Sequence, residues 1–156
     1  MEAEVDGAFA NIDTNLQRRA DLIPNLVNTV KGYASHEKEV IDSVTAARAK
    51  LTGASTVEEK AAADSELTSA LNRLLVIVEN YPDLKASENF TQLADELAGT
   101  ENRIAVARRD YNDAVKAFNT SIRKFPNSIL AGIFGFSQKA YFEASAGAQN
   151  APNVEF

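Results

Sequence analysis

The chain has 156 residues, of which 45% are hydrophobic and 24% are charged, with a formal net charge of -6 and no cysteine. This length and composition are ordinary for one globular domain with its own core, and they argue against a disordered chain. The negative charge disfavours bulk attraction to nucleic acid or to an anionic lipid surface. The absence of cysteine excludes disulfides, thiolate metal sites and a cysteine nucleophile. No run of 18 apolar residues occurs, so no segment is expected to span a bilayer.

A ladder of apolar residues occupies the first third of the chain, with spacings that mostly alternate between three and four. Its members are Phe9, Ile12, Leu16, Ile23, Leu26, Val30, Tyr33, Val40, Val44, Ala47 and Leu51. This heptad-like spacing predicts a long amphipathic helix that packs as in a coiled coil, with a left-handed twist. At ~1.5 Å per residue, such a helix would approach ~70 Å.

Pro24 interrupts this ladder, because an interior proline removes a backbone hydrogen bond and clashes with the preceding turn. In one interpretation the helix kinks at Pro24 and continues. In the other it ends near Asp21, which then caps a new helix with Pro24 in its first turn. The ladder keeps its phase across the proline, and a sharp reversal has no need to preserve phase, so we favour the kink.

A second helix is predicted to begin after the break at residues 51–55. Thr56 followed three residues later by Glu59 forms a capping box. The second ladder consists of Leu67, Leu71, Leu74, Val78 and Tyr81. Pro82 ends this helix, since the residue before a proline is pushed out of helical geometry. Residues 82–87 then form a connection with room for a helical turn of its own.

A third ladder with the same alternation runs from Phe90 to Phe125 and ends at Pro126. The predicted fold class is therefore all-α: an antiparallel bundle of three long helices, the first kinked or split near Pro24 and then countable as a fourth. We assign residues 1–126 to this bundle. In residues 127–156, which are rich in small residues, we expect a short helical turn near 128–134 and then an extended tail that packs on the bundle.

Three polar residues stand on or beside the ladders where an apolar residue is expected: Arg19, Glu37 and Thr100. They either form a polar layer inside the bundle, which fixes its register or lines a site, or they reach water at the edge of the stripe. Long side chains commonly keep their charged ends in water, so we favour the second interpretation.

The sequence does not indicate a catalytic or metal site. His36 is the only histidine, which excludes a di-iron site built from two Glu-x-x-His pairs. Val40 stands where a zinc-protease motif needs a second histidine. Neither a nucleophile elbow nor a phosphate-binding glycine-rich loop occurs. We therefore expect no enzymatic activity, no metal and no cofactor.

Two features are candidates for a surface contact. The basic doublets Arg18-Arg19, Arg108-Arg109 and Arg123-Lys124 are able to bind an anion or a lipid headgroup, although such doublets more often pair with nearby acids. The apolar residues between Ile129 and Phe142 would form an interface or a membrane contact if they were exposed. An exposed patch of that size would threaten solubility, so we favour a tail that folds back over one end of the bundle.

Long runs of this sequence are distinctive in their polar as well as their apolar residues. They are residues 11–27, which include Arg18-Arg19-Ala20-Asp21-Leu22-Ile23-Pro24, and residues 30–34, 36–37, 81–86, 101–105, 107–112, 125–129 and 135–136. Together these runs resemble the bacterial LemA family, and the resemblance extends over nearly the whole chain. One departure is Ala140, where the family often has proline before Tyr-Phe; it affects only the tail.

The resemblance implies a helical bundle that follows a single N-terminal transmembrane anchor in a bacterial membrane. This chain begins about where that anchor would end, so we expect the anchor to precede Met1. The family has no established enzymatic activity and supplies no active-site residues, and Asp21 and Pro24 look structural, as a cap and a kink. The candidate interaction residues are the polar members of the shared runs: Arg18, Arg19, Arg103, Arg108, Asp110 and Asn112.

We predict a non-enzymatic, membrane-tethered module of the bacterial cell envelope that acts by contact with a protein partner of unknown identity. One alternative is a lipid-responsive scaffold that uses the basic doublets and the apolar tail. A second alternative is a bundle that binds a small ligand or a metal. No interaction with nucleic acid is expected.

Overall fold

A computed structural model describes residues 2–123 and 139–142 of the chain. Five helices follow one another: α1 Glu2–Lys31, α2 Lys38–Gly53, α3 Val57–Val78, α4 Pro82–Lys85 and α5 Glu88–Arg123. No strand occurs in these two ranges, and the predicted all-α class is confirmed. The helical turn expected near residues 128–134 and the domain boundary at 126 lie outside the described residues.

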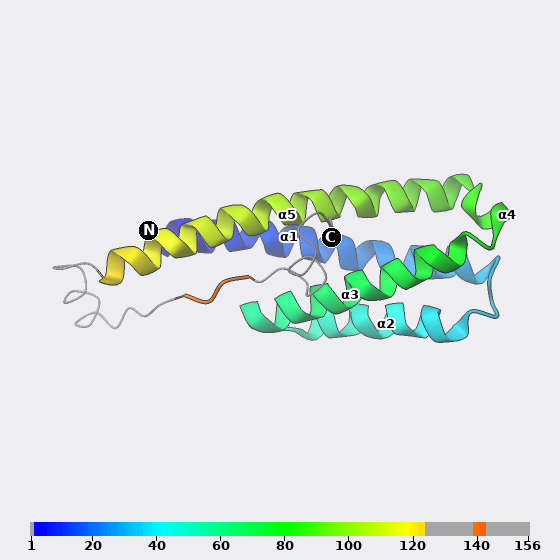
Figure 1. The fold of residues 1–156 in the computed structure, drawn as a ribbon, viewed down its shortest axis with the longest axis horizontal. Helices are drawn as coiled ribbons and strands as arrows, with labels where there is room; N and C mark the ends of the chain where they lie inside the picture. The colour runs from blue at the N-terminus through cyan, green and yellow to red at the C-terminus, as the bar shows by residue number, and fades with distance from the viewer. Residues whose placement is uncertain (1, 124–138, 143–156) are drawn as a thin grey trace.

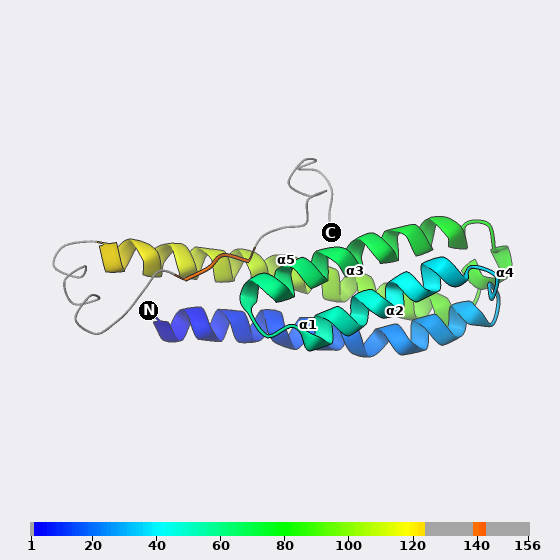
Figure 2. The same ribbon diagram turned by 90° about the horizontal axis from the view of Figure 1, so that it is seen from below.

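The four longer helices alternate in direction along one common axis (Figure 1). α1 packs along α5 and against α2, and α2 packs against α3, whereas α3 and α5 meet across a more open seam. The hairpin of α2 and α3 is shorter than α1 and α5 and covers only part of their length (Figure 2). Beyond the tip of this hairpin, residues 2–8 of α1 and 112–123 of α5 form what we call the two-helix end.

The first ladder is divided between two helices, so the single kinked helix predicted over its whole length is wrong. α1 ends at Lys31, the Gly32 N–H donates to the Thr29 carbonyl at 3.2 Å, and the chain reverses before α2 begins at Lys38. The count of three long helices is not confirmed for the same reason: four longer helices occur, as in the alternative count, but the division lies between Lys31 and Lys38 and not near Pro24. Two antiparallel helices that face one core can carry stripes of the same spacing, so a continuous phase does not identify a single helix.

Pro24 lies inside α1 without ending it, and Asp21 is an exposed residue of the same helix rather than a cap. A proline lacks the N–H that would bind the carbonyl four residues earlier, which here is the carbonyl of Ala20. Arg48 on α2 supplies the missing donor, because its Nε lies 2.8 Å from the Ala20 oxygen. The bond that the proline removes is thus replaced from a neighbouring helix, and α1 continues to Lys31.

The start of α3 confirms the predicted capping box. The Thr56 hydroxyl accepts a hydrogen bond from the Glu59 N–H at 3.1 Å, and the Glu59 carboxylate accepts one from the Thr56 N–H at 3.1 Å. The hydrogen bond from the Thr56 backbone is the main reason that the pKa of Glu59 lies below its usual value. α3 then stops at Val78, before Pro82, and the helical turn expected in residues 82–87 is α4.

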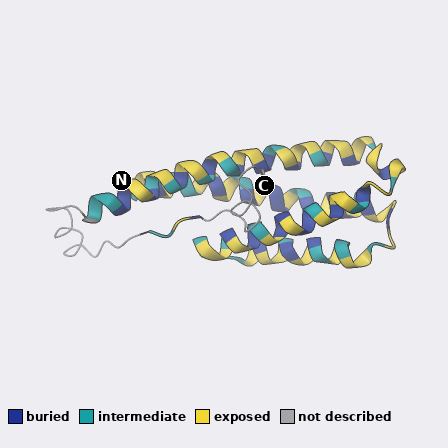
Figure 3. Cartoon of the chain, viewed as in Figure 1, coloured by how far each residue is buried: buried dark blue, intermediate teal, exposed yellow. Residues whose placement is uncertain are grey.

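Buried side chains line the inner faces of the long helices, and exposed side chains cover the outer faces (Figure 3). They form one continuous apolar core that extends from Val5 near the start of α1 to Leu84 on α4 and includes Phe142. Among the described residues, no helix has the length and hydrophobicity that a membrane crossing requires. Because the core is apolar, the polar side chains buried within it are exceptions, and each needs a physical explanation.

Candidate functional site

Arg19 on α1 is the largest fully buried side chain in the described part of the chain, with 0% exposure. Its Nη1 donates a hydrogen bond to Asp64 Oδ1, and its Nη2 donates one to Thr68 Oγ1 at 2.9 Å, both on α3. The same Nη1 lies 2.5 Å from Oε1 of Glu101 on α5. We call Arg19, Asp64, Thr68 and Glu101 the charge layer. The expectation that Arg19 reaches water is wrong, because its partners from two other helices enclose it.

The helices place these partners by simple periodicity. Asp64 and Thr68 are four residues apart, so they lie on the same face of α3. Asp64 also stands three residues before Leu67 and thus continues the second ladder toward the core. The other two polar residues of the ladders are placed differently. Thr100 is buried and donates to the Leu97 carbonyl at 2.7 Å within α5, whereas Glu37 is half-buried before α2 and accepts from the Tyr81 hydroxyl at 2.9 Å.

The charge layer has two carboxyl groups for one guanidinium. Burial raises the pKa of Glu101 to about 7, the Arg19 charge opposes that rise, and the nearby Asp64 adds to it. Burial also raises the pKa of Asp64, against the opposing charge and hydrogen bond of Arg19. Arg19 Nε is buried without a hydrogen-bond acceptor in the described residues, and the contact of Glu101 Oε1 is its ion pair with Arg19 Nη1. The four residues of the layer carry a net charge of -1 when both carboxyls are ionised, which the nearby charge of Arg108 offsets only in part, and Glu101 can take up a proton near pH 7.

An apolar groove with a volume of about 80 Å³ lies beside the charge layer, in the seam between α3 and α5. α3 contributes Leu71, Leu74 and Leu75, α5 contributes Phe90 and Leu97, and both Arg19 and Glu101 reach the lining. Leu75 is 40% exposed. The volume is about half of the ~150 Å³ that holds benzene in an engineered cavity. It suits one side chain rather than a drug-sized ligand.

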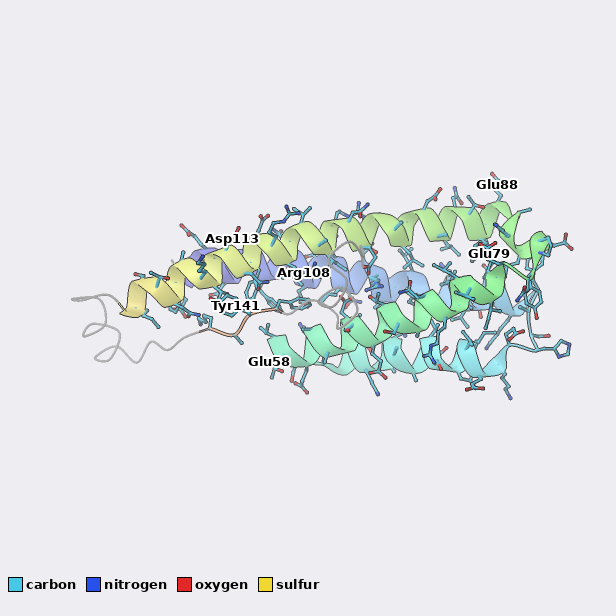
Figure 4. All side chains as sticks on the ribbon, in the orientation of Figure 1. Glu58, Glu79, Glu88, Arg108, Asp113 and Tyr141 are labelled. Atoms are coloured by element: carbon cyan, nitrogen blue, oxygen red, sulfur yellow. The ribbon has the colours of Figure 1, made fainter. Side chains whose placement is uncertain are left out.

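Of the predicted interaction residues, Arg19 belongs to the charge layer and Arg108 lies near it. Arg108 lies on α5 (Figure 4). It is half-buried, and its charge lowers the pKa of both Asp64 and Glu101. Arg18 is exposed, so the doublet that it forms with Arg19 is split between water and core. A lipid headgroup or another anion therefore does not meet paired cations there.

The remaining predicted residues lie elsewhere. Arg103 is exposed on α5 and donates from Nε to Asn15 Oδ1 of α1 at 3.2 Å. Asp110 is exposed and is not part of the charge layer. Asn112 belongs to the two-helix end, where its side chain binds the backbone of Phe142.

Sequence reasoning missed Asp64, Thr68 and Glu101 as the partners of Arg19. A signal was present, since Arg19 and Asp64 occupy ladder positions and Glu101 stands beside one, between Leu97 and Ile104. Three helices that each turn one charged residue toward the same core indicate a shared layer. The charges in the layer differ in sign, as mutual neutralisation requires.

The described residues contain no group of three or more histidine, aspartate or glutamate side chains placed to hold a metal ion. His36 is exposed in the turn between α1 and α2. The chemistry that the charge layer offers is an ionisable carboxyl beside a fixed guanidinium, next to an apolar groove. Such an arrangement can bind a cationic group or exchange a proton.

Comparison with known proteins gives a consistent result. The sequence model of the LemA family matches residues 8–156. The chain is 31% identical to Protein LemA of Metamycoplasma hominis over 147 residues, 91% of this chain and 65% of that protein. It is 30% identical to Magnetosome protein MamQ of Magnetospirillum gryphiswaldense, and 28% identical to Magnetosome protein MamQ 2 of Paramagnetospirillum magneticum, each over 62% of that protein. The chain thus spans less than two thirds of the curated relatives it matches, and their names state no enzymatic activity.

Proposed function

The chain belongs to the LemA family, and we propose that it is a non-enzymatic module of the bacterial cell envelope that acts by contact with another protein. We further propose that a single N-terminal segment anchors the full-length protein in a membrane. The relatives support this proposal, since each is longer than the part that this chain matches. The unmatched part, more than a third of each relative, has room for an anchor of about 20 residues.

The groove between α3 and α5 is the proposed contact, and one observation carries it. Glu101 Oε1 is buried beside an apolar groove, and the one guanidinium that it contacts, that of Arg19 at 2.5 Å, is shared with Asp64. A lysine side chain from a partner helix fits both properties. Its methylenes would pack against Leu74 and Phe90, as lysine stems do on apolar surfaces, and its ammonium would give Glu101 a cation that it does not share with Asp64.

Photo-crosslinking in membranes tests this proposal on the full-length gene product. A photoreactive amino acid at Leu75, which lines the groove, should yield one defined crosslinked protein. Mass spectrometry should find a lysine beside the crosslinked position of that protein. Fractionation of the same cells should place the full-length protein with the membranes.

Two variants provide the comparison. Ala98→Trp fills the groove, and Glu101→Gln removes the carboxylate that would bind the ammonium, so both should reduce the crosslinked product. Val106→Trp changes an exposed residue of α5 that does not line the groove and should leave the product unchanged. A product that persists in Ala98→Trp, or a full-length protein that stays out of the membrane fraction, would contradict the proposal.

A further inference from the structure

Residues 139–142 run antiparallel to α5 at the two-helix end (Figure 1), where two asparagine side chains hold their backbone. Asn119 Nδ2 donates to the Lys139 carbonyl at 3.2 Å, and its Oδ1 accepts the Lys139 N–H at 2.8 Å. Asn112 makes the same pair of bonds with Phe142, at 3.0 and 2.9 Å. Each asparagine therefore binds the N–H and the C=O of one residue, as a neighbouring β-strand would.

The spacing of the two asparagines matches an extended chain. Asn112 and Asn119 are seven positions apart, a rise of about 10.5 Å along α5. Lys139 and Phe142 are three positions apart, which spans about 10 Å in an extended chain. The two pairs of hydrogen bonds therefore form together only when the bound segment is extended. The two asparagines contact only the backbone of the bound segment, so their hydrogen bonds accept any sequence that has an N–H at both positions.

Selectivity comes from the side chains at the two ends of the segment. Phe142 is 1% exposed and belongs to the core, so its position requires a large apolar side chain. Lys139 Nζ lies 3.2 Å from Glu2 Oε1 and 5.6 Å from the centroid of the Phe118 ring, which favours a cation at that position. Tyr141 points away and is 44% exposed (Figure 4), so its position makes little demand.

We propose that this face of α5 is a recognition site for an extended segment of a partner protein, with a basic residue followed three positions later by an aromatic one. Residues 139–142 occupy the site as a built-in competitor. Residues 124–138, fifteen in all, join them to α5 in the same chain, and such a covalent connection makes the competition intramolecular, which raises the effective concentration of the built-in segment. The site is separate from the groove between α3 and α5, and it stands whether or not the groove binds a partner.

A fluorescent peptide that copies residues 137–144 is the probe, and the full chain is the receptor. In Phe142→Asp the built-in segment loses its buried anchor, so the peptide should bind this variant at least about tenfold more tightly than the wild type. Adding Asn112→Ala and Asn119→Ala to Phe142→Asp should abolish that gain. A peptide with alanine in place of the residue that copies Phe142 should not bind.

Equal binding to the wild type and to Phe142→Asp would overturn the proposal, as would binding that survives loss of both asparagines. Dimers of Phe142→Asp with wild-type chains, detected by light scattering, would make a second copy the occupant and would also overturn it. If Phe142→Asp does not fold, hydrogen exchange on the wild type decides. Excess peptide should then reduce protection of the Lys139 and Phe142 amides, and unchanged protection would contradict the proposal.

Discussion

α1 and α5 run side by side through the whole molecule, and different segments of the chain cover them at its two ends. Where the hairpin of α2 and α3 packs on α1 and α5, two helices complete the core, and the charge layer links α1, α3 and α5. At the two-helix end, Val5 and Val115 are as fully buried as residues under the hairpin. There, however, residues 139–142 lie against α5 in place of the hairpin. The apolar ladders thus specify which residues are buried, whereas a few polar side chains determine what covers them.

The replacement of Arg19 by methionine should break this arrangement most severely. Arg19→Met leaves Asp64 and Glu101 buried without their cation, and removal of one partner from a buried ion pair typically costs about 3–5 kcal/mol. Urea unfolding of the full chain measures the loss. Arg18→Met is the matched control, since Arg18 is exposed, and it should change the free energy of unfolding by less than about 0.5 kcal/mol.

The pH dependence of stability should report on Glu101. Its pKa in the folded protein, about 7, lies above the ordinary value of 4.5, so the folded state binds the proton more tightly than the unfolded state. The resulting stabilisation, roughly 3 kcal/mol, is complete below pH 4.5 and is lost as the pH rises through 7. The raised pKa of Asp64 acts in the same direction.

Urea unfolding at intervals from pH 5 to pH 8 separates this effect from the other carboxyls. Glu101→Gln mimics the protonated side chain, so its stability should fall less steeply with pH than that of the wild type. Glu96→Gln, at an exposed position of the same helix, should leave the wild-type slope intact. Parallel curves for wild type and Glu101→Gln would show that Glu101 does not titrate in this range.

Arg48→Met tests how α1 tolerates Pro24. The change removes the donor to the Ala20 carbonyl, and a buried carbonyl without a partner costs about 1–3 kcal/mol. Combination with Pro24→Ala restores the N–H within α1, so the cost of Arg48→Met should largely disappear in that background. An equal cost in both backgrounds would mean that Arg48 acts through packing alone.

Asn112→Ala should have the most local effect, one that is confined to the two-helix end. It removes two hydrogen bonds to Phe142, each worth about 1 kcal/mol. Hydrogen exchange should show faster exchange of the Phe142 amide, with unchanged protection of α2 and α3. Loss of protection in the hairpin as well would show that the two ends are not independent.

Features that depend on neighbours in the sequence were predictable. The capping box of Thr56 and Glu59 involves residues three apart, and its two hydrogen bonds follow from that spacing alone. The ladder of α5 and the helical turn at Pro82 are equally local. The reversal at Gly32 was not found, because the ladder on α2 continues the spacing of the ladder on α1.

Features that join distant residues were only partly predictable. Arg48 contacts Ala20 across 28 positions, and Arg19 contacts Asp64 across 45, so no local pattern couples them. Arg19 was recognised as an unusual residue on an apolar stripe, but its burial depends on partners from α3 and α5. Asn119 stands one residue after a ladder position, as Asn112 does, and only the bound segment shows what the two have in common.

The shared guanidinium of Arg19 is the centre of this account, and a double-mutant cycle tests it directly. The free energies of unfolding of wild type, Arg19→Met, Asp64→Asn and the double variant give the coupling between the two side chains. A buried, hydrogen-bonded pair predicts a coupling of about 1.5–3 kcal/mol. A coupling of only a few tenths of a kcal/mol, as in exposed ion pairs, would contradict a buried charge layer.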